Sequence, residues 1–245
     1  MELFYDLHIH TGLSPCGDLD MTPNNIVNMA GLKGLDVIAI TDHNSCGNCK
    51  AVLEAGARIN PELIIIPGME VETSEEIHCI CLFANITVAL EFDEFIKANS
   101  FNIKNRSDIY GRQALYNSND KEIGEHKNLL LTATKIDLYS MVKEVKARSG
   151  AIFPAHVDRG SYSVISSLGF VPDDLDISFV EFSKNIVPEE FAAKNKNHLL
   201  REFEFLQSSD AHYLWDICEK NRTINVKNRS AKAVIEYLRG TNNET

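Results

Sequence analysis

The chain lacks an excess of positive charge. Its 24 lysine and arginine residues are outnumbered by 35 aspartate and glutamate residues, which gives a formal net charge of −11 at pH 7. A general nucleic-acid-binding protein would carry a basic surface for the phosphate backbone. The composition therefore argues against a protein that binds polymeric nucleic acid, and bound metal ions would offset part of the negative charge.

Long apolar runs are also absent. No stretch is long enough to span a membrane, and the first six residues contain neither the basic nor the apolar region of an export signal. We therefore expect a cytoplasmic protein with no membrane partner. In that compartment its six cysteines are expected to be thiols and not a disulfide framework.

One cysteine pair has metal-site spacing but lacks a second pair. Cys46 and Cys49 form a Cys-x-x-Cys sequence, whereas a zinc ribbon needs two such pairs. A redox role for this pair is the alternative. We expect instead that Cys46 and Cys49 are ordinary thiols near the start of a helix.

What the chain does contain is an α/β rhythm over most of its 245 residues, of which 44% are hydrophobic. Apolar runs typical of strands alternate with helical patterns. Strands are expected near 3–9, 36–40, 63–66, 77–83, 151–153, 180–182 and 204–207, and helices at 22–34, 48–59, 137–148 and 230–238. This order predicts a barrel in a single domain, 1–245, with its site at the C-terminal strand ends. A polar segment at about 91–135 interrupts the rhythm and predicts a helix, a loop and a β-hairpin inserted as a lid or wall.

Histidine and carboxylate side chains gather at the ends of these apolar runs. They are His8, His10, Asp18, His43, Glu70, His78, His156, Asp210 and His212. Only His126 and His198 of the eight histidines lie outside the pattern, and both are expected to be solvated or core residues. Imidazoles and carboxylates together suit Zn, Mn or Fe. Two or three such divalent ions side by side are the usual means of hydrolysing phosphate esters.

In this order the fragments resemble the PHP family, named for polymerase and histidinol phosphatase. His8-Ile9-His10 resembles its first motif and Thr41-Asp42-His43 its second. Glu70 with His78 resembles the third, and Asp210-Ala211-His212 the last, with His156 between them. The resemblance runs through nearly the whole chain. It implies a distorted (β/α)₇ barrel that holds up to three divalent ions.

The resemblance also implies a division of the ligands. One ion would be held by His8, His10, Glu70 and Asp210. Glu70 would bridge to a second ion, held also by His78 and His156. A third would use Asp18, His43 and His212. Members of the family place the ligand that corresponds to Asp18 at variable distances after the first motif. Asp20 is therefore an alternative to Asp18.

Further residues are candidates for catalysis beside the bridging Glu70. Asp42 is next to a ligand and is expected to orient an imidazole. Arg159 follows His156 by three residues, and its planar fork would fit two phosphate oxygens. Glu181 and Lys184, after another strand, are weaker candidates for the border of the pocket.

These residues favour a metal-dependent phosphoesterase that hydrolyses a small phosphomonoester or nucleotide through a metal-bridging hydroxide. The first alternative is a nuclease acting on short oligonucleotides or RNA ends, for which the inserted segment offers Lys97, Lys104, Arg106, Arg112, Lys121 and Lys127. The second is a non-catalytic regulatory module that binds metal, which would be expected to have lost ligands. The sequence does not indicate an oligomeric state.

Overall fold

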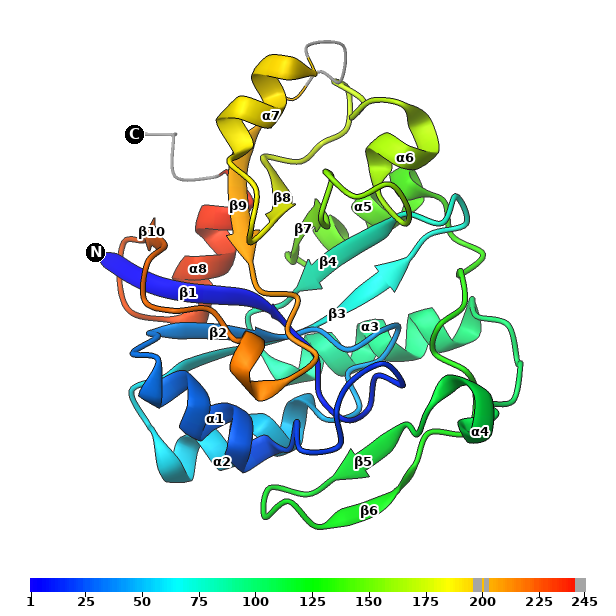
Figure 1. Cartoon of the computed structure of the whole chain (residues 1–245), viewed down its shortest axis with the longest axis vertical. Coiled ribbons are helices and arrows are strands. Elements are labelled where there is room, and N and C mark those ends of the chain that lie inside the picture. The colour runs from blue at the N-terminus through cyan, green and yellow to red at the C-terminus, as the bar shows by residue number, and fades with distance from the viewer. Residues whose placement is uncertain (196–199, 201–202, 241–245) are drawn as a thin grey trace.

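The chain folds around a curled sheet flanked by helices (Figure 1). The structure is a computed structural model, and it describes residues 1–195, 200 and 203–240. The larger sheet has the strand order β10-β1-β2-β3-β4-β7. Its strands are β1 (Glu2–Ile9), β2 (Val37–Ile40), β3 (Ile64–Glu72), β4 (His78–Leu82), β7 (Ala151–Pro154) and β10 (Thr223–Asn225).

The first half of the sheet follows the expected strand and helix alternation. Strands β1, β2 and β3 run parallel. Helix α1 (Pro23–Leu32) joins the first two, and α2 (Cys49–Ile59) joins the next two. Because these three strands point in the same direction, their carboxyl ends meet at one edge of the sheet.

The alternation breaks at β4. Residues 73–77 make a tight connection without a helix, so that β4 pairs antiparallel with β3 and brings His78 opposite Glu72. Strand β7 is in turn antiparallel to β4. The end of β4 that lies at the site is therefore its first residue. The expectation that the site lies only at C-terminal strand ends is wrong for this strand.

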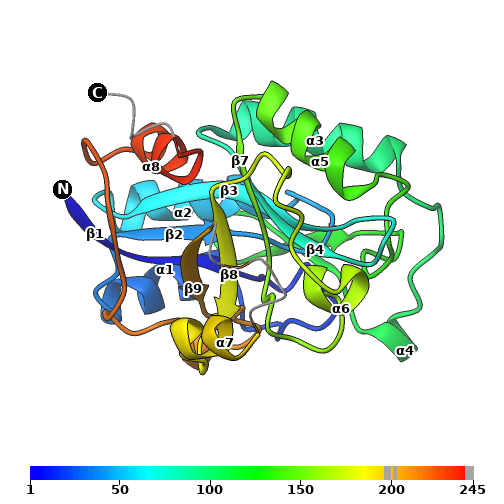
Figure 2. The same ribbon diagram turned by 90° about the horizontal axis from the view of Figure 1, so that it is seen from above.

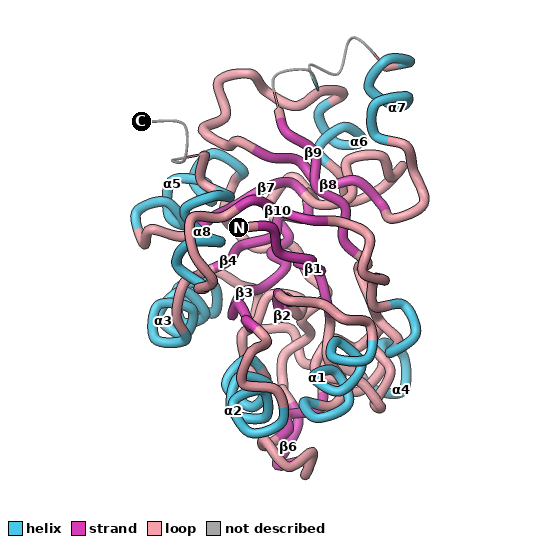
Figure 3. The backbone as a smooth tube through the Cα atoms, turned by 90° about the vertical axis from the view of Figure 1, so that its left-hand side faces the viewer, coloured by secondary structure: helices cyan, strands magenta, loops and turns pink. Residues whose placement is uncertain are grey.

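Two further strands continue the curl. Strands β8 (Phe179–Ser183) and β9 (Glu204–Ser208) pair in parallel. The Val157 amide donates to the carbonyl of Glu181 at 2.8 Å, and the His10 amide donates to that of Ala211 at 2.9 Å. These bonds tie β8 to the segment after β7, and the segment after β9 to β1. Seen along the strands in Figure 3, the sheet and this pair follow one another around a closed wall.

Helices cover the outside of the wall. Figure 2 shows the strands in the middle, with α3 (Ile86–Ala98) and α5 (Leu138–Ala147) on one side and α7 (Pro188–Lys194) on the other. Helix α8 (Ala231–Leu238) adds Val234 and Leu238 to the apolar cluster that Leu7, Ile66 and Phe153 form inside the wall. The short helices are α6 (Val164–Leu168) and the 3₁₀ turn η3 (Leu214–Asp216). Among the helices of the described residues, none is both long and apolar enough to cross a bilayer.

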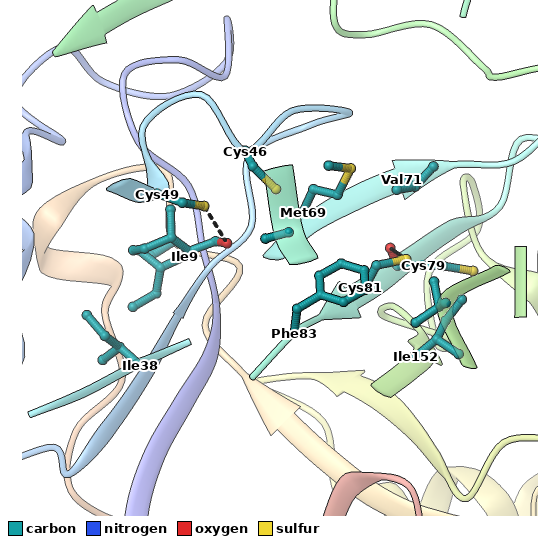
Figure 4. Close-up of a cluster of buried hydrophobic side chains, with 14 of the residues drawn as sticks. Ile9, Ile38, Cys46, Cys49, Met69, Val71, Cys79, Cys81, Phe83 and Ile152 are labelled. Carbon is teal, nitrogen blue, oxygen red and sulfur yellow. Dashed lines mark hydrogen bonds between the residues drawn. The ribbon is translucent and has the colours of Figure 1, made fainter. Parts of the chain in front are cut away.

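A second apolar cluster lies between the sheet and the helices, and it takes up the Cys-x-x-Cys pair. Cys46 and Cys49 are buried free thiols beside Met69 (Figure 4). Both thiols lie within hydrogen-bond distance of the Gly68 carbonyl, at 3.2 and 3.4 Å. Their surroundings are those of packed core residues, and Cys49 is the first residue of α2.

The polar insert leaves the sheet after α3. Residues 91–98, which were expected to belong to it, form the second half of that helix. Beyond them lie α4 (Ser107–Tyr110) and a hairpin of β5 (Ala114–Tyr116) and β6 (Glu122–Glu125), at the bottom of Figure 1. The Ala114 amide donates to the Gly12 carbonyl at 2.8 Å, and the Tyr116 hydroxyl to that of Leu19 at 3.0 Å. The hairpin is thus fastened to the loop that follows β1.

Candidate metal centre

The end of β1 presents two imidazoles to the interior. Leu3, Tyr5 and Leu7 belong to the inner apolar cluster, whereas Ile9 belongs to the outer one. The pairing register with β2 shifts between Asp6 and Ile9, as at a β-bulge. A bulge reverses the alternation of side chains. After it, His8 and His10 share the inner face, and their Nε2 atoms lie 3.2 Å apart.

Glu70, near the end of β3, lies at the centre of the cluster. Its Oε1 is 2.8 Å from Nδ1 of His78 and 3.1 Å from Nε2 of His156. Its Oε2 is 3.0 Å from Nδ1 of His43 and 3.4 Å from Nε2 of His10. One buried carboxylate therefore contacts imidazoles from several separate strand ends.

Asp210 supplies the second carboxylate. Its Oδ1 lies 3.2 Å from Nε2 of His8 and 3.1 Å from Nε2 of His10. The buried Asp6 accepts the amide of Ser209 at 3.0 Å and that of Cys218 at 2.9 Å, which holds the segment after β9 against β1. The structural role of Asp6 was not predicted from the sequence.

Two of the converging residues have unusual backbone conformations. His156 has φ +30° and Asp210 has φ +51°. Positive φ costs free energy in residues other than glycine, and such strain gathers at functional sites. Each residue follows a strand directly or nearly so, at the point where the backbone turns its side chain into the cluster.

Buried partners orient the imidazoles from behind. Ser14 Oγ donates to Asp42 at 2.7 Å and lies 2.9 Å from Nδ1 of His10. Glu181 Oε2 lies 2.8 Å from Nδ1 of His8. With Nδ1 carrying the proton in each ring, both Nε2 atoms are left as ligands. Asp42 thus reaches the imidazole of His10 through Ser14. Glu181 lies behind His8 and does not border the pocket.

Protonation balances the charge of the cluster. Burial alone would lower the pKa of His10, but its hydrogen bond to Asp210 and its contact with the Glu70 carboxylate raise that pKa to about 9. Burial would also lower the pKa of His43, but the charge of Glu70 raises it to about 9. Burial and the nearby positive charge of His10 lower the pKa of His212 to about 4. Burial would lower the pKa of His8 as well, but the charges of Glu181, Asp210 and Glu70 raise it well above its ordinary value, so His8, His10 and His43 all favour a proton where no cation is bound.

The donors fall into three overlapping groups, and in each group the ligand atoms lie within 4.8 Å of one another. They are His8, His10, Glu70 and Asp210; His43, Glu70 and His78; and His10, His43 and His212. The buried Oε2 of Glu70 and Nδ1 of His156 make no hydrogen bond to any described residue. Buried polar atoms are usually satisfied by hydrogen bonds, so a buried carboxylate oxygen that contacts the imidazoles of His43 and His10 without a hydrogen bond fits a ligand of a divalent ion.

Asp18 and Asp20 do not join the described groups. The carboxylate of Asp18 accepts the amide of Asp20 at 2.8 Å, and Asp20 is exposed. The amide of Asp18 donates to the carbonyl of His212 at 2.9 Å. The side chain that reaches His212 is Cys16, whose Sγ lies 3.0 Å from Nε2.

A cavity of about 520 Å³ opens over the cluster. Arg159 lies at its edge with a 44% exposed side chain, and its Nη2 is 2.7 Å from Oδ2 of Asp210. Tyr162 stacks on His78 with ring centroids 5.0 Å apart. Part of the wall is formed by residues 131–133, which come from the end of the inserted segment.

Two other candidates lie elsewhere. Lys184 donates to Asp216 at 3.1 Å and does not line this cavity. The Nδ1 of His126 pairs with the carbonyl of Asn128 at 2.9 Å within the insert. His198 is outside the described residues.

A family model, the PHP domain, matches residues 6–163. The chain is similar to the 5'-3' exoribonuclease Rnm of Salmonella typhimurium, with 37% identity over 90 residues, or 36% of this chain and 29% of that protein. It is also similar to the protein of that name from Escherichia coli, with 35% identity over 88 residues, or 35% of this chain and 29% of that protein. The alignments thus span less than a third of these curated relatives.

Among solved structures, the fold is shared with a lesion-specific endonuclease from Pyrococcus furiosus. The TM-score is 0.67 at 20% sequence identity, and the match covers 99% of this chain and 57% of that one. The similarity supports the mixed α/β architecture with its curled sheet.

Proposed function

Because the chain belongs to the PHP domain family, we propose that it is a metal-dependent phosphoester hydrolase acting on a nucleotide-sized substrate. The observation that carries this proposal is the convergence of imidazoles on Glu70 and Asp210 beneath one cavity. We propose further that residues 1–245 form a single domain based on a distorted (β/α)₇ barrel.

The residues divide into holding and orienting roles. The three described groups would hold the ions, with His156 completing the set around Glu70. Divalent ions held there supply Lewis-acid activation of water and of the phosphoryl oxygens. Glu181, and Asp42 through Ser14, keep two imidazoles in the tautomer that a ligand needs.

Arg159 would bind the phosphoryl group. Its guanidinium lies at the mouth of the cavity, beside Asp210, and is partly open to solvent. An Arg can offer two parallel N–H donors to phosphate oxygens. Phosphate bound there would lie next to the candidate ions.

The cavity favours a compact substrate. Its volume of about 520 Å³ falls within the range of small-molecule pockets, roughly 300–1,000 Å³. Glu72 and Glu76 also line the cavity. Burial raises the pKa of Glu72 to about 7. The carboxylate of Glu76 would repel a long polyanion, whereas Glu72 is only partly ionised near pH 7.

Three of the six candidate cations of the insert form ion pairs with carboxylates. Lys97 pairs with Asp93 at 2.6 Å, Arg106 with Asp108 at 2.8 Å, and Arg112 with Glu125 at 2.6 Å. These partners cancel much of the positive charge that a nucleic-acid backbone would need.

The second candidate is a nuclease that trims the end of a short oligonucleotide. The names of the relatives favour it, since both curated proteins are called 5'-3' exoribonucleases. A terminal nucleotide in the same cavity would need only a few contacts outside it. This candidate uses the same ions but releases a mononucleotide from an oligonucleotide, whereas the first candidate releases phosphate from a nucleotide.

Product analysis would test both candidates. The full chain, reconstituted with Mn²⁺ or Zn²⁺, is incubated with nucleoside mono- and bisphosphates and with short 5'-labelled RNA and DNA. We expect metal-dependent phosphate release from a mononucleotide that is abolished in Asp210→Asn and retained in Asp20→Asn. Release of mononucleotides from RNA would favour the nuclease. If fully metallated protein hydrolyses none of these substrates, the remaining hypothesis is a non-catalytic module that binds metal.

A further inference from the structure

The loop after β1 brings a thiol to the candidate metal centre. Cys16 lines the cavity, and its Sγ lies 3.0 Å from Nε2 of His212. The thiol is also close enough to His43 to help raise the pKa of that imidazole. We propose that Cys16, and not Asp18 or Asp20, completes the third ion site with His43 and His212. The inference rests on the metal centre of the proposed function.

Fixed backbone contacts place this thiol. The Asp18 amide donates to the His212 carbonyl at 2.9 Å, and the Gly17 amide donates to the Ser14 carbonyl at 2.8 Å. A Cβ on Gly17 would lie 2.5 Å from the Thr11 carbonyl oxygen, so this tight turn needs glycine. Asp18 therefore holds the loop on His212 through its backbone, while its carboxylate caps the amide of Asp20.

A second observation points to a ligand at the same place. Glu70 is 1% exposed, and its Oε2 has no hydrogen bond to any residue in the described ranges. This oxygen lies 3.0 Å from Nδ1 of His43. The imidazoles of His10, His43 and His212 also form a group of their own that could hold a metal ion, and Cys16, which lies outside that group, reaches it through its contact with His212. A cation bound between these rings would lie near the thiol, which contacts His212, and near Oε2 of Glu70, which contacts His43.

The chemical consequence is metal selectivity. Thiolates are soft ligands that favour Zn, Fe or Co, whereas carboxylate oxygens suit Mn and Mg. Metal binding by the thiol releases its proton to solvent, and the sulfur binds as a thiolate. Cys16 is the one exposed cysteine, so the other thiols are poorly placed to compete for added metal.

Cobalt spectroscopy tests the assignment. The full chain is freed of metal with a chelator, loaded with Co²⁺, and its visible and near-ultraviolet absorption is recorded. Nitrogen and oxygen ligands give only weak visible bands, whereas a thiolate adds a strong sulfur-to-cobalt charge-transfer band. We expect this band in the unmodified protein and in Asp18→Asn and Cys218→Ala, and its loss in Cys16→Ser. Cys16→Asp should keep the third ion without the band.

The outcomes distinguish a failure of Cys16 as a ligand from a failure of the metal centre itself. Bound cobalt without a charge-transfer band, or a band that persists in Cys16→Ser, overturns the role of Cys16 and leaves the centre standing. No bound cobalt at all overturns the centre itself. Alkylation by iodoacetamide, mapped by mass spectrometry, provides a second readout that needs no variant. Zn²⁺ should slow modification of Cys16 at least tenfold, and an unchanged rate in fully metallated protein would contradict the proposal.

Discussion

At the scale of single residues, hydrogen bonds behind the imidazoles decide which nitrogen faces the candidate ions. Glu181 is 2% exposed and holds Nδ1 of His8 at 2.8 Å. Glu181→Gln keeps the shape and removes the charge that makes the imidazole a stronger ligand. We expect metal affinity to fall roughly 10- to 100-fold, measured by competition with a chromophoric chelator.

The matched control lies on the neighbouring strand. Glu204 is exposed on β9, so Glu204→Gln removes the same charge far from the imidazoles. Equal affinities for the Glu181 variant and the unmodified protein would mean that the tautomer of His8 is set by another contact.

Arg159 allows a second prediction at this scale. Its guanidinium contacts Asp210 at 2.7 Å, and a guanidinium, which stays protonated and has no lone pair to offer, is not a metal ligand. Arg159→Ala should leave the metal content unchanged. It should lower kcat/KM roughly 10- to 100-fold, because a hydrogen bond to a charged group contributes about 1.5–3 kcal/mol. Steady-state kinetics with metal analysis checks both parts, and an unchanged kcat/KM would remove Arg159 from the phosphate site.

Residue chemistry explains how much of the centre was readable from the sequence. Histidines and carboxylates at strand ends have few uses other than metal binding, and the structure brings the predicted ones together except for Asp18. The contribution of Cys16 was not readable, because a loop of tight turns decides which side chain reaches His212. Glu181 was underrated since nothing local links it to a histidine more than 170 residues away.

At the scale of elements, the loop after β1 depends on the inserted segment. Gly111 has φ +100°, and a Cβ there would lie 2.1 Å from the carbonyl oxygen of Pro15. Gly111→Ala should destabilise the protein by more than about 1 kcal/mol, since alanine is strained at positive φ and would displace Pro15. The melting temperature, measured by calorimetry, should fall.

Helix α1 offers the control for this substitution. Gly31 lies within the helix, where the nearest atom to an added Cβ is 3.5 Å away. Gly31→Ala should be neutral or stabilising by up to about 1 kcal/mol. If both variants melt alike, the contact between the insert and Pro15 is unimportant for stability.

Element boundaries were readable where local chemistry marks them. Ser230 caps α8 by accepting the Ala233 amide at 3.1 Å, and Pro23 is the first residue of α1. Thr22 precedes that helix, but its side chain makes no capping hydrogen bond. The reversal of β4 was not readable, because an apolar strand has the same pattern in either direction. The pairing of Glu72 with His78 across a short turn decides it.

At the scale of the whole molecule, the acidic composition and the site are linked through the free energy of unfolding. The chain carries a formal net charge of −11, and the buried Glu70 and the largely buried Asp210 concentrate two of its negative charges at one place. Without metal, protons on the histidines and the guanidinium of Arg159 balance these carboxylates. Ions that bind the folded state and not the unfolded one should therefore raise the melting temperature, and chelation should lower it.

The same linkage predicts a pH dependence that metal removes. The pKa values of His10 and His43 are about 9 in the folded protein, above the ordinary value of 6.5. The folded state then binds more protons than the unfolded state between these values, so stability falls as pH rises. The contribution is complete below pH 6.5 and is lost as pH passes 9. Melting temperatures of the chelated protein should decline between pH 7 and 9.5, whereas those of the metal-loaded protein should decline much less because ions replace the protons. Parallel declines in both forms would show that these histidines do not carry the counter-charge of Glu70 and Asp210.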